Sequence, residues 1–358
     1  MPACGSQVIL CDVPIRFDTY EGCSHLCEYC FVQRKSDVFN NIKPKETVAS
    51  LINFIKGQRT GDVAWCDWDI PLHWGGLSDP FQPAERKMHH SLEALKVFAK
   101  TQYPFIVSTK NKMIAEEPYL SLIKQCNCVV QFSCTAPEYN KIEKGASTFE
   151  ERVEAARKIT AMGKRVNMRC QPYIPKYFES VKKSIEVFHK AGVHGCIFEG
   201  IKYIKKVPGT TRLQGDFVYP SDLYRKHFEV FKKMLHERGM KFYCGENRLR
   251  SMGDSLCCCG IEGMGWHENK ANLNHYLYDR ENFKFTEQMQ NGDKSGVCFK
   301  SLNQSAIGKM VYYTPYAKLM SMYTRDLGAI STLLPDEKVE KLKRKCKKGN
   351  NIFNTIEI

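Results

Sequence analysis

The chain has 358 residues, with 43% hydrophobic and 26% charged side chains, and this composition excludes a wholly disordered protein. No run approaches the ~18 uninterrupted apolar residues of a membrane span, and the first residues lack a secretory signal, so we expect a cytoplasmic protein without a membrane partner. The formal net charge of +14, from 53 Lys+Arg against 39 Asp+Glu, favours an anionic partner but does not bear on the fold.

Short apolar segments alternate with segments of helical period through the first two-thirds of the chain. We predict strands at Ile15–Tyr20, Ile70–Trp74, Phe105–Thr109, Cys128–Ser133, Val166–Cys170 and Cys196–Glu199. Between them, apolar residues recur at helical spacing, as at Val48, Leu51, Ile52 and Ile55. Six β-then-α units in series predict an α/β protein built as a partial (β/α)6 TIM-like barrel. A doubly wound open sheet is the alternative.

The spacing from Ser147 to Glu150 is typical of a capping box and predicts a helix start at that point. After Arg250 the alternation of strands and helices is lost. We therefore divide the chain into a barrel, residues 1–250, and a C-terminal extension rich in Cys, Gly and Tyr, residues 251–358, packed on the barrel. The basic run at 341–348 could grip a nucleic-acid backbone or could be a solvated helix end.

The 17 cysteines of a cytoplasmic chain indicate reduced thiols and metal ligands rather than disulfides. Cys23, Cys27 and Cys30 follow the first predicted strand and can converge on one site from a single loop. Three thiolates are one short of a closed iron–sulfur or zinc site, which leaves a position for a substrate or cofactor. Three interpretations remain: an iron–sulfur cluster with one open iron, a zinc site for which His25 is poorly placed as fourth ligand, and coincidental core cysteines.

The C-x3-C-x2-C loop after strand one resembles the radical S-adenosylmethionine (SAM) enzymes, over roughly residues 6 to 200. The resemblance implies that Cys23, Cys27 and Cys30 hold a [4Fe–4S] cluster whose fourth iron binds SAM. It further implies reductive cleavage of SAM to a 5′-deoxyadenosyl radical that abstracts hydrogen from a substrate. An electron donor such as flavodoxin or ferredoxin would then be a partner.

The same resemblance implies further cofactor-binding residues near the first two strands. Tyr29 occupies the aromatic position that the family places near the adenine. Gly75 and Gly76 end the second strand, where the family's glycine-rich turn receives the methionine amino group. Ser78 follows in this turn. A plain turn is the alternative for the two glycines.

Three more cofactor-binding residues are implied near the ends of later strands. Lys110 and Ser133 lie where carboxylate and ribose contacts are expected, and Arg169 could pair with the methionine carboxylate. The alternatives are a solvated loop cation for Lys110 and a structural ion pair for Arg169. All three lie near the carboxyl ends of strands, the face on which barrel enzymes build their sites.

Four stretches resemble the branch of the family that is related to spore photoproduct lyase, or DNA repair photolyase-like. They are Cys23–Lys35, Gly76–Glu85, Ile142–Arg152 and Gln171–Pro175. The lyase carries a hydrogen-donating cysteine before a Thr-Ser-Asp segment, whereas Gly76 stands before Leu77, Ser78 and Asp79 here. The resemblance therefore implies the branch and a nucleic acid or nucleotide substrate, but not the photolyase activity.

A second group of cysteines comprises Cys244 and the triplet Cys257–Cys259. Three interpretations are open for this group. It could bind an auxiliary Fe–S cluster, for which Cys298 is a further candidate ligand. It could instead supply a radical-relay or substrate-binding thiol, or its members could fill the core. An auxiliary cluster would favour an enzyme that modifies a peptide or protein. A hypothesis of another class is a non-catalytic nucleic-acid-binding protein with a zinc loop.

Overall fold

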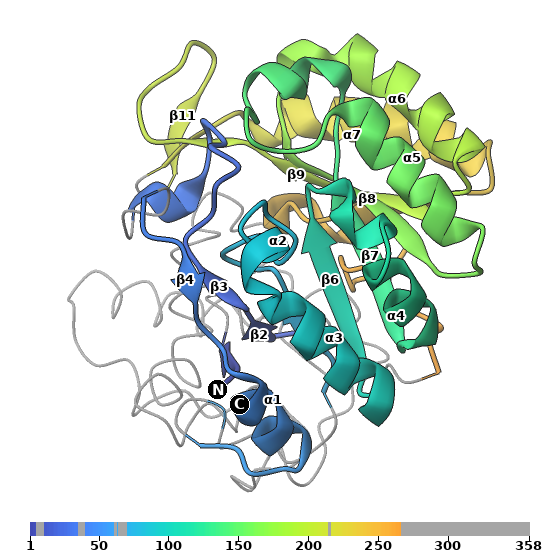
Figure 1. Ribbon diagram of the computed structural model, residues 1–358. Helices are drawn as coiled ribbons and strands as arrows, with labels where there is room; N and C mark the ends of the chain where they lie inside the picture. Colours follow the sequence, from blue (N-terminus) through green and yellow to red (C-terminus); the bar gives the residue numbers. More distant parts are fainter. Residues whose placement is uncertain (5–10, 35–39, 61–62, 64–69, 214–215, 266–358) are drawn as a thin grey trace, which may run out of the picture.

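The computed structural model describes residues 1–4, 11–34, 40–60, 63, 70–213 and 216–265 (Figure 1). Its main sheet has eight strands in the order β1-β2-β5-β6-β7-β8-β9-β13. They are β1 (Ala3–Cys4), β2 (Ile15–Phe17), β5 (Leu72–Trp74), β6 (Phe105–Thr109), β7 (Cys128–Ser133), β8 (Val166–Tyr173), β9 (Gly195–Gly200) and β13 (Lys241–Cys244). Strand β1 runs antiparallel to β2, and every other neighbouring pair is parallel.

Helices lie between the parallel strands in chain order and cover the outer side of the sheet (Figure 1). They are α1 (Val48–Ile55), α2 (Glu85–Met88), α3 (His90–Thr101), α4 (Tyr119–Gln125), α5 (Phe149–Thr160), α6 (Phe178–Lys190) and α7 (Ser221–His236). Because the strand order never reverses, the doubly wound alternative is wrong and the partial α/β barrel is confirmed. The barrel is not closed, since β13 pairs only with β9 among the described strands.

Shorter elements follow the ends of the barrel strands. The short strands outside the main sheet are β3 (Tyr20–Glu21), β4 (Lys43–Pro44), β10 (Lys202–Tyr203), β11 (Thr211–Leu213) and β12 (Asp216–Val218). The 3-10 helices are η2 (Phe31–Arg34), η4 (Lys112–Ala115), η5 (Pro137–Lys141), η6 (Pro175–Tyr177) and η7 (Asn247–Met252). No helix of the described residues has the length and apolar character that crossing a bilayer requires.

Strand β6 presents alternate residues to two different cores. Phe105 and Val107 of β6 belong to the large core under the helices. Ile106 between them belongs to a smaller core on the concave face, together with Cys259 and Ile261. The segment after η7 therefore folds back into the open barrel, where the Cys259 carbonyl accepts a 2.7 Å hydrogen bond from Gln131 Nε2. The division of the chain into a barrel, 1–250, and an extension, 251–358, stays a prediction, because residues 266–358 lie outside the described ones.

The predicted capping box is shifted by one residue. Thr148, not Ser147, caps α5: its hydroxyl accepts from the Glu151 amide at 3.2 Å, and Glu151 Oε2 accepts from the Thr148 amide at 2.9 Å. Ser147 instead accepts a hydrogen bond from the Lys112 amide.

Thr148→Ala is expected to lower the free energy of unfolding by about 1 kcal/mol, because the Glu151 amide at the start of α5 loses the hydroxyl that accepts its hydrogen bond. Chemical denaturation measures this difference, and Thr148→Ser, which keeps the hydroxyl, is the control. Equal stability of the alanine variant and the parent would contradict the assigned cap.

Candidate cofactor site at the carboxyl ends of the strands

The three cysteines of the C-x3-C-x2-C motif lie on one loop between β3 and η2. Cys27 is buried, while Cys23 and Cys30 are partly exposed. The Cys30 amide donates to the Cys27 carbonyl at 3.1 Å, and Leu26 adopts a left-handed backbone conformation with φ of 50°. The loop therefore turns tightly between its second and third thiols.

We call the loop of the three cysteines, residues 22–30, the ligand loop. The loop that follows β7 and η5 pairs with it. Cys27 forms an antiparallel bridge with Glu143, and the Gly145 amide donates to the His25 carbonyl at 2.9 Å. A Cβ atom on Gly145 would lie 2.2 Å from the Ser24 carbonyl oxygen. Only glycine lets the two backbones approach so closely.

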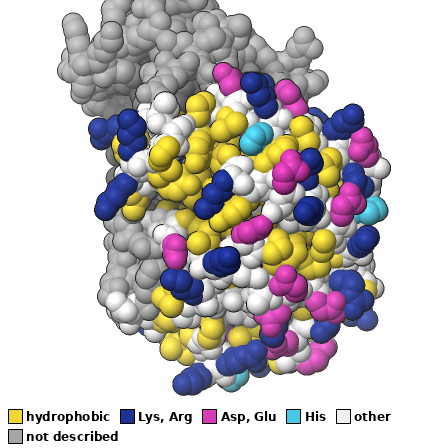
Figure 2. All heavy atoms as spheres, turned by 90° about the horizontal axis from the view of Figure 1, so that it is seen from above, with side chains coloured by type: hydrophobic (Ala, Val, Ile, Leu, Met, Phe, Trp, Pro, Cys, Tyr) yellow, Lys and Arg dark blue, Asp and Glu magenta, His cyan; other side chains and the backbone are white. Residues whose placement is uncertain are grey.

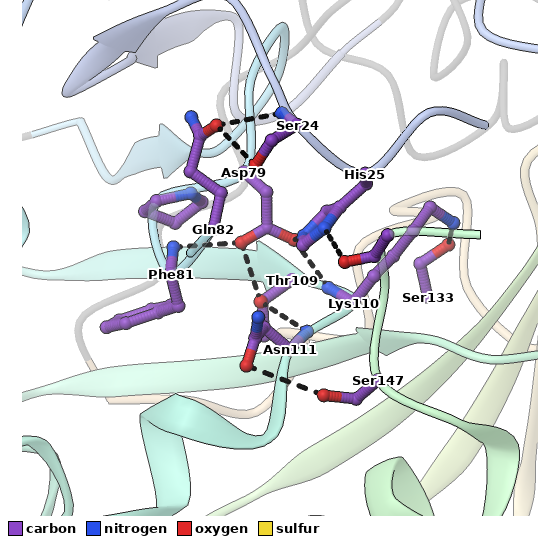
Figure 3. A network of polar contacts seen from close by, with 12 residues as sticks. Ser24, His25, Asp79, Phe81, Gln82, Thr109, Lys110, Asn111, Ser133 and Ser147 are labelled. Atoms are coloured by element: carbon purple, nitrogen blue, oxygen red, sulfur yellow. Dashed lines mark hydrogen bonds and ion pairs between the residues drawn. The ribbon is translucent and has the colours of Figure 1, made fainter. Parts of the chain in front are cut away.

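Asp79, in the turn after β5, fixes the ligand loop from a second side (Figure 3). Its Oδ1 accepts from Thr109 Oγ1 and from the Phe81 amide, both at 2.8 Å. Its Oδ2 accepts from the Lys110 amide at 2.6 Å and lies 3.0 Å from His25 Nε2. Burial alone would raise the pKa of Asp79, but the charge of His25 and these hydrogen bonds lower it. The site thus contains a buried carboxylate.

His25 lies inside the cysteine motif with both ring nitrogens directed at acceptors of the chain itself. Its Nδ1 is 2.9 Å from the Gly145 carbonyl, and its Nε2 faces Asp79. This arrangement does not leave His25 as a fourth zinc ligand. Gln82 hydrogen-bonds to the residues on both sides of Cys23. Its Oε1 accepts from the Ser24 backbone amide at 2.9 Å, and its Nε2 donates to the Gly22 carbonyl at 3.0 Å.

The structure brings together three of the sequence-predicted residues, Tyr29, Lys110 and Ser133. Lys110 Nζ donates to the Tyr29 hydroxyl at 2.9 Å and also to Ser133 Oγ. The same ammonium lies 2.9 Å from Glu143 Oε1, and its side chain is only 15% exposed. The interpretation of Lys110 as a solvated loop cation is therefore wrong.

Glu143 joins this group to the helix layer. Tyr29 donates its hydroxyl proton to Glu143 Oε1, and Arg152 of α5 lies 2.6 Å from Glu143 Oε2. Burial would raise the pKa of Glu143, but the charges of Lys110 and Arg152 outweigh it and lower this pKa to about 2.

This shift predicts a pH-dependent stability of the iron-free protein. Because the folded-state pKa of Glu143 lies below its ordinary value of about 4.3, its stabilisation is complete above that value and is lost as pH falls toward 2. The difference in unfolding free energy between the parent and Glu143→Gln should therefore shrink from pH 5 to pH 2. Denaturant titrations over this range measure it, and a difference that does not change with pH would contradict the assigned charge.

Gly75, Gly76 and Ser78 lie in the turn that leads to Asp79. Gly75 has a φ of 87°, and a Cβ there would lie 2.5 Å from the Ser108 carbonyl oxygen. A Cβ on Gly76 would lie 2.8 Å from Arg16 Cδ. Ser78 is buried and donates to the Tyr20 carbonyl at 2.6 Å. The backbone thus requires glycine at position 75, while the Ser78 hydroxyl is used in a hydrogen bond within the chain.

Arg169 lies on β8 and contacts two neutral amides. Its NH1 donates to Gln131 Oε1 at 2.8 Å, and its NH2 donates to Gln171 Oε1. In the part of the chain that the structure describes, no carboxylate pairs with Arg169, so the structural ion pair is not observed. No hydrogen bond there joins it to Tyr29, Lys110 or Ser133.

The second cysteine group divides between the two cores: Cys257 and Cys259 lie in the small core on the concave face, and Cys244 lies in the large core. Cys244 is buried, with its thiol 3.5 Å from the Glu246 carbonyl, and Cys259 contacts the thiol of Cys11, which the sequence did not single out. Cys298 lies outside the described residues. Over the described ranges, no three His, Cys, Asp or Glu side chains are already arranged to hold a metal ion.

The ligand loop nevertheless has the donor chemistry of an iron–sulfur site. Burial raises the pKa of the Cys23 thiol and of the Cys27 thiol, each to about 12, and each thiol also responds to the charge of Cys30. Both are thus neutral in the free protein, and a bound iron would supply the charge that displaces their protons. The structure fixes the backbone of the loop that carries these thiols.

The described part of the chain is an open α/β barrel. Among solved structures it is similar to spore photoproduct lyase complexed with dinucleoside spore photoproduct, with a TM-score of 0.54 and 15% identity over 68% of this chain and 79% of that one. A double mutant of spore photoproduct lyase with bound AdoMet and dinucleoside spore photoproduct matches with a TM-score of 0.52 and 16% identity, over 64% and 76%. No protein-family model and no curated protein sequence matches the chain.

Proposed function

We propose that the chain is a radical SAM enzyme whose Cys23, Cys27 and Cys30 hold a [4Fe–4S] cluster. The observation that carries this proposal is the ligand loop, which buried contacts to Asp79 and Glu143 fix at the carboxyl ends of the barrel strands. The likeness of the fold to spore photoproduct lyase supports it. When bound, the cluster and SAM would supply a 5′-deoxyadenosyl radical that abstracts hydrogen from the substrate.

The residues of this chain would orient the cofactor and exclude water. Tyr29 would contact the adenine. The backbone of the turn at Gly75 and Gly76 would contact the methionine amino group. Lys110 and Ser133 would contact the carboxylate and ribose at the strand ends. Since the Lys110 ammonium already contacts Tyr29, Ser133 and Glu143, we expect cofactor binding to replace its contact with Ser133.

We propose a nucleic acid or nucleotide as the substrate. The net charge of +14 and the dinucleoside bound by the similar spore photoproduct lyase support this choice. Lesion reversal by a hydrogen-donating cysteine is not part of the proposal, because Gly76 stands at that position. An enzyme that modifies a peptide or protein with an auxiliary cluster is the second candidate, and the convergence of Cys11 with Cys259 favours it.

Metal analysis with a cleavage assay tests the function. Anaerobically purified protein should contain about four irons per chain and should release 5′-deoxyadenosine and methionine from SAM with dithionite. Colourless protein with one zinc would contradict the proposal and favour the zinc-loop alternative. About eight irons would indicate an auxiliary cluster, and the pair Cys244→Ala and Cys258→Ala should then lose half of them.

Binding to oligonucleotides tests the substrate class. We expect the affinity for single-stranded DNA or RNA to fall steeply as salt rises, because cationic side chains displace counterions from phosphates. Absence of binding at low salt would remove the nucleic-acid proposal while leaving SAM cleavage intact. A flavodoxin or ferredoxin type of donor can replace dithionite in the same assay to identify the reductant.

A further inference from the structure

A chain of hydrogen-bonded side chains crosses the concave face of the barrel. Ser108 Oγ lies 3.0 Å from His73 Nε2 and donates to Gln131 Oε1 at 3.0 Å, and the Gln131 amide oxygen also accepts from Arg169. Beyond Arg169, Gln171 Nε2 donates to Glu199 Oε2 at 2.6 Å. We call this set the interior polar chain; its members, from β5 to β9, are His73, Ser108, Gln131, Arg169, Gln171 and Glu199.

The interior polar chain lies on the inside of the barrel. Its members alternate with residues of the large core, such as Val107, Val130 and Phe198. Apart from Gln131, every member is partly exposed. These side chains therefore form a wall that a ligand in the open barrel can touch.

Arg169 is the cation at the centre of this wall. Its contacts among the described residues are the amide oxygens of Gln131 and Gln171, which carry no charge to balance the guanidinium. Burial, together with the charges of Arg169 and Arg16, lowers the pKa of His73 to about 3, so this neighbour is neutral near pH 7. Glu199 at the end of the chain already pairs with Lys202 at 3.0 Å.

A second guanidinium lies near Arg169 on the side that faces the triplet. The charges of Arg250 and Arg169 both act on the Cys258 thiol there.

The two glutamine amides also fix the plane of the guanidinium. They use one N–H on each terminal nitrogen of Arg169, and arginine carries five N–H groups in all. The others remain as a planar fork of the kind that matches phosphate or carboxylate oxygens in pairs. The wall therefore presents a pre-oriented donor group to the interior.

Figure 2 shows one outer face of the described residues, on which Lys and Arg are interspersed with Asp and Glu around an apolar area. Such a mixed face does not select anions by its field. Recognition of an anion is thus more strongly supported at Arg169 than on this face.

We infer that Arg169, oriented by Gln131 and Gln171, binds an anionic group of the substrate, a phosphate, inside the barrel. This inference rests on the proposed nucleotide substrate, and it assigns Arg169 to the substrate rather than to the methionine carboxylate. The hydrogen-bond partners of the Arg169 guanidinium among the described residues are neutral amides, so a bound anion would compensate the positive charge of this side chain. The side chain would select nucleotides over nucleosides.

Calorimetry with thymidine 5′-monophosphate, thymidine and SAM as separate probes tests the inference on the iron-loaded protein. Arg169→Gln should weaken binding of the monophosphate about 10- to 100-fold, leave thymidine unchanged and leave SAM unchanged. Arg169→Lys should restore part of the loss. Arg165→Gln is the matched control, because the Arg165 guanidinium donates to the Gly260 and Glu262 carbonyls and is not hydrogen-bonded to the interior polar chain. This variant should bind every probe as the parent does.

A second variant keeps the guanidinium and changes only its partner. Gln131→Glu gives Arg169 a carboxylate of the chain itself, so the monophosphate should lose affinity as in Arg169→Gln. Equal affinity for the monophosphate in the parent and Arg169→Gln would overturn the inference. A loss of affinity for SAM in Arg169→Gln, with no loss for the monophosphate, would also overturn the inference. It would indicate that Arg169 binds the cofactor. Protein that binds the monophosphate but never cleaves SAM would contradict the proposed function alone.

Discussion

Replacing Cys23, Cys27 or Cys30 by alanine should each abolish release of 5′-deoxyadenosine and remove the iron of the cluster. A [4Fe–4S] cluster with three protein thiolates has no spare ligand. The ligand loop supplies no fourth thiol, and its His25 is engaged by Asp79 and Gly145. Iron per chain and the visible absorption of the anaerobic protein measure the loss. We expect less than a tenth of the parental cleavage rate in each variant.

Cys128→Ala is the control for this prediction. Cys128 is a buried core residue of β7, so its loss should lower stability but leave the iron content unchanged. If one loop variant kept full iron and activity, the assignment of that thiol as a ligand would be wrong. If Cys128→Ala also lost its iron, the effect would reflect folding and not ligation.

Asp79→Ala is expected to have the largest effect on stability of any single change at the site. It leaves His25 without its ion pair and removes the acceptor of the Thr109 hydroxyl and of the Phe81 and Lys110 amides. Breaking a buried, hydrogen-bonded charge pair typically costs 3–5 kcal/mol, so we expect a loss of about that size. Chemical denaturation of the iron-free protein measures it, and the reconstituted variant should release iron to a chelator faster than the parent.

Asp79→Asn separates charge from shape in this network. Its amide oxygen can still accept from Thr109 and Phe81, while the ion pair with His25 is lost. In a double-mutant cycle with His25→Gln, the two changes should therefore be non-additive by at least about 0.5 kcal/mol. A loss below 1 kcal/mol for Asp79→Ala would show that Asp79 does not hold the ligand loop.

Much of the fold could be predicted because buried parallel strands are short apolar runs that end at turn residues. The strands at Phe105–Thr109 and Cys128–Ser133 match β6 and β7 in full. The first predicted strand was too long, since β2 ends at Phe17, where Asp18 turns the chain and accepts from the Leu77 amide. The β10–β12 sheet and β13 were missed as predicted strands, because such short segments carry little periodicity.

The candidate site was predictable only where a residue type or spacing identifies its chemistry. The cysteine spacing indicated the ligand loop. Tyr29, Lys110 and Ser133 are in contact although they come from separate segments, and their roles toward a cofactor stay predictions. Asp79 and Glu143 stood inside stretches that resembled the family, yet nothing local shows that these acids are buried. Their roles depend on partners 30 to 114 residues away in the chain, a distance that no local pattern encodes.

The long-range anchoring of the ligand loop has a consequence for how the protein would acquire its metal. Tyr29 meets Glu143, and Glu143 meets Arg152 of α5, so the loop gains its final shape only after β6, β7 and α5 have formed. During synthesis the cysteines leave the ribosome well before these partners. Cluster insertion should accordingly be a late maturation step, and chains halted before residue 152 should expose the Cys27 thiol, which is buried in the finished protein.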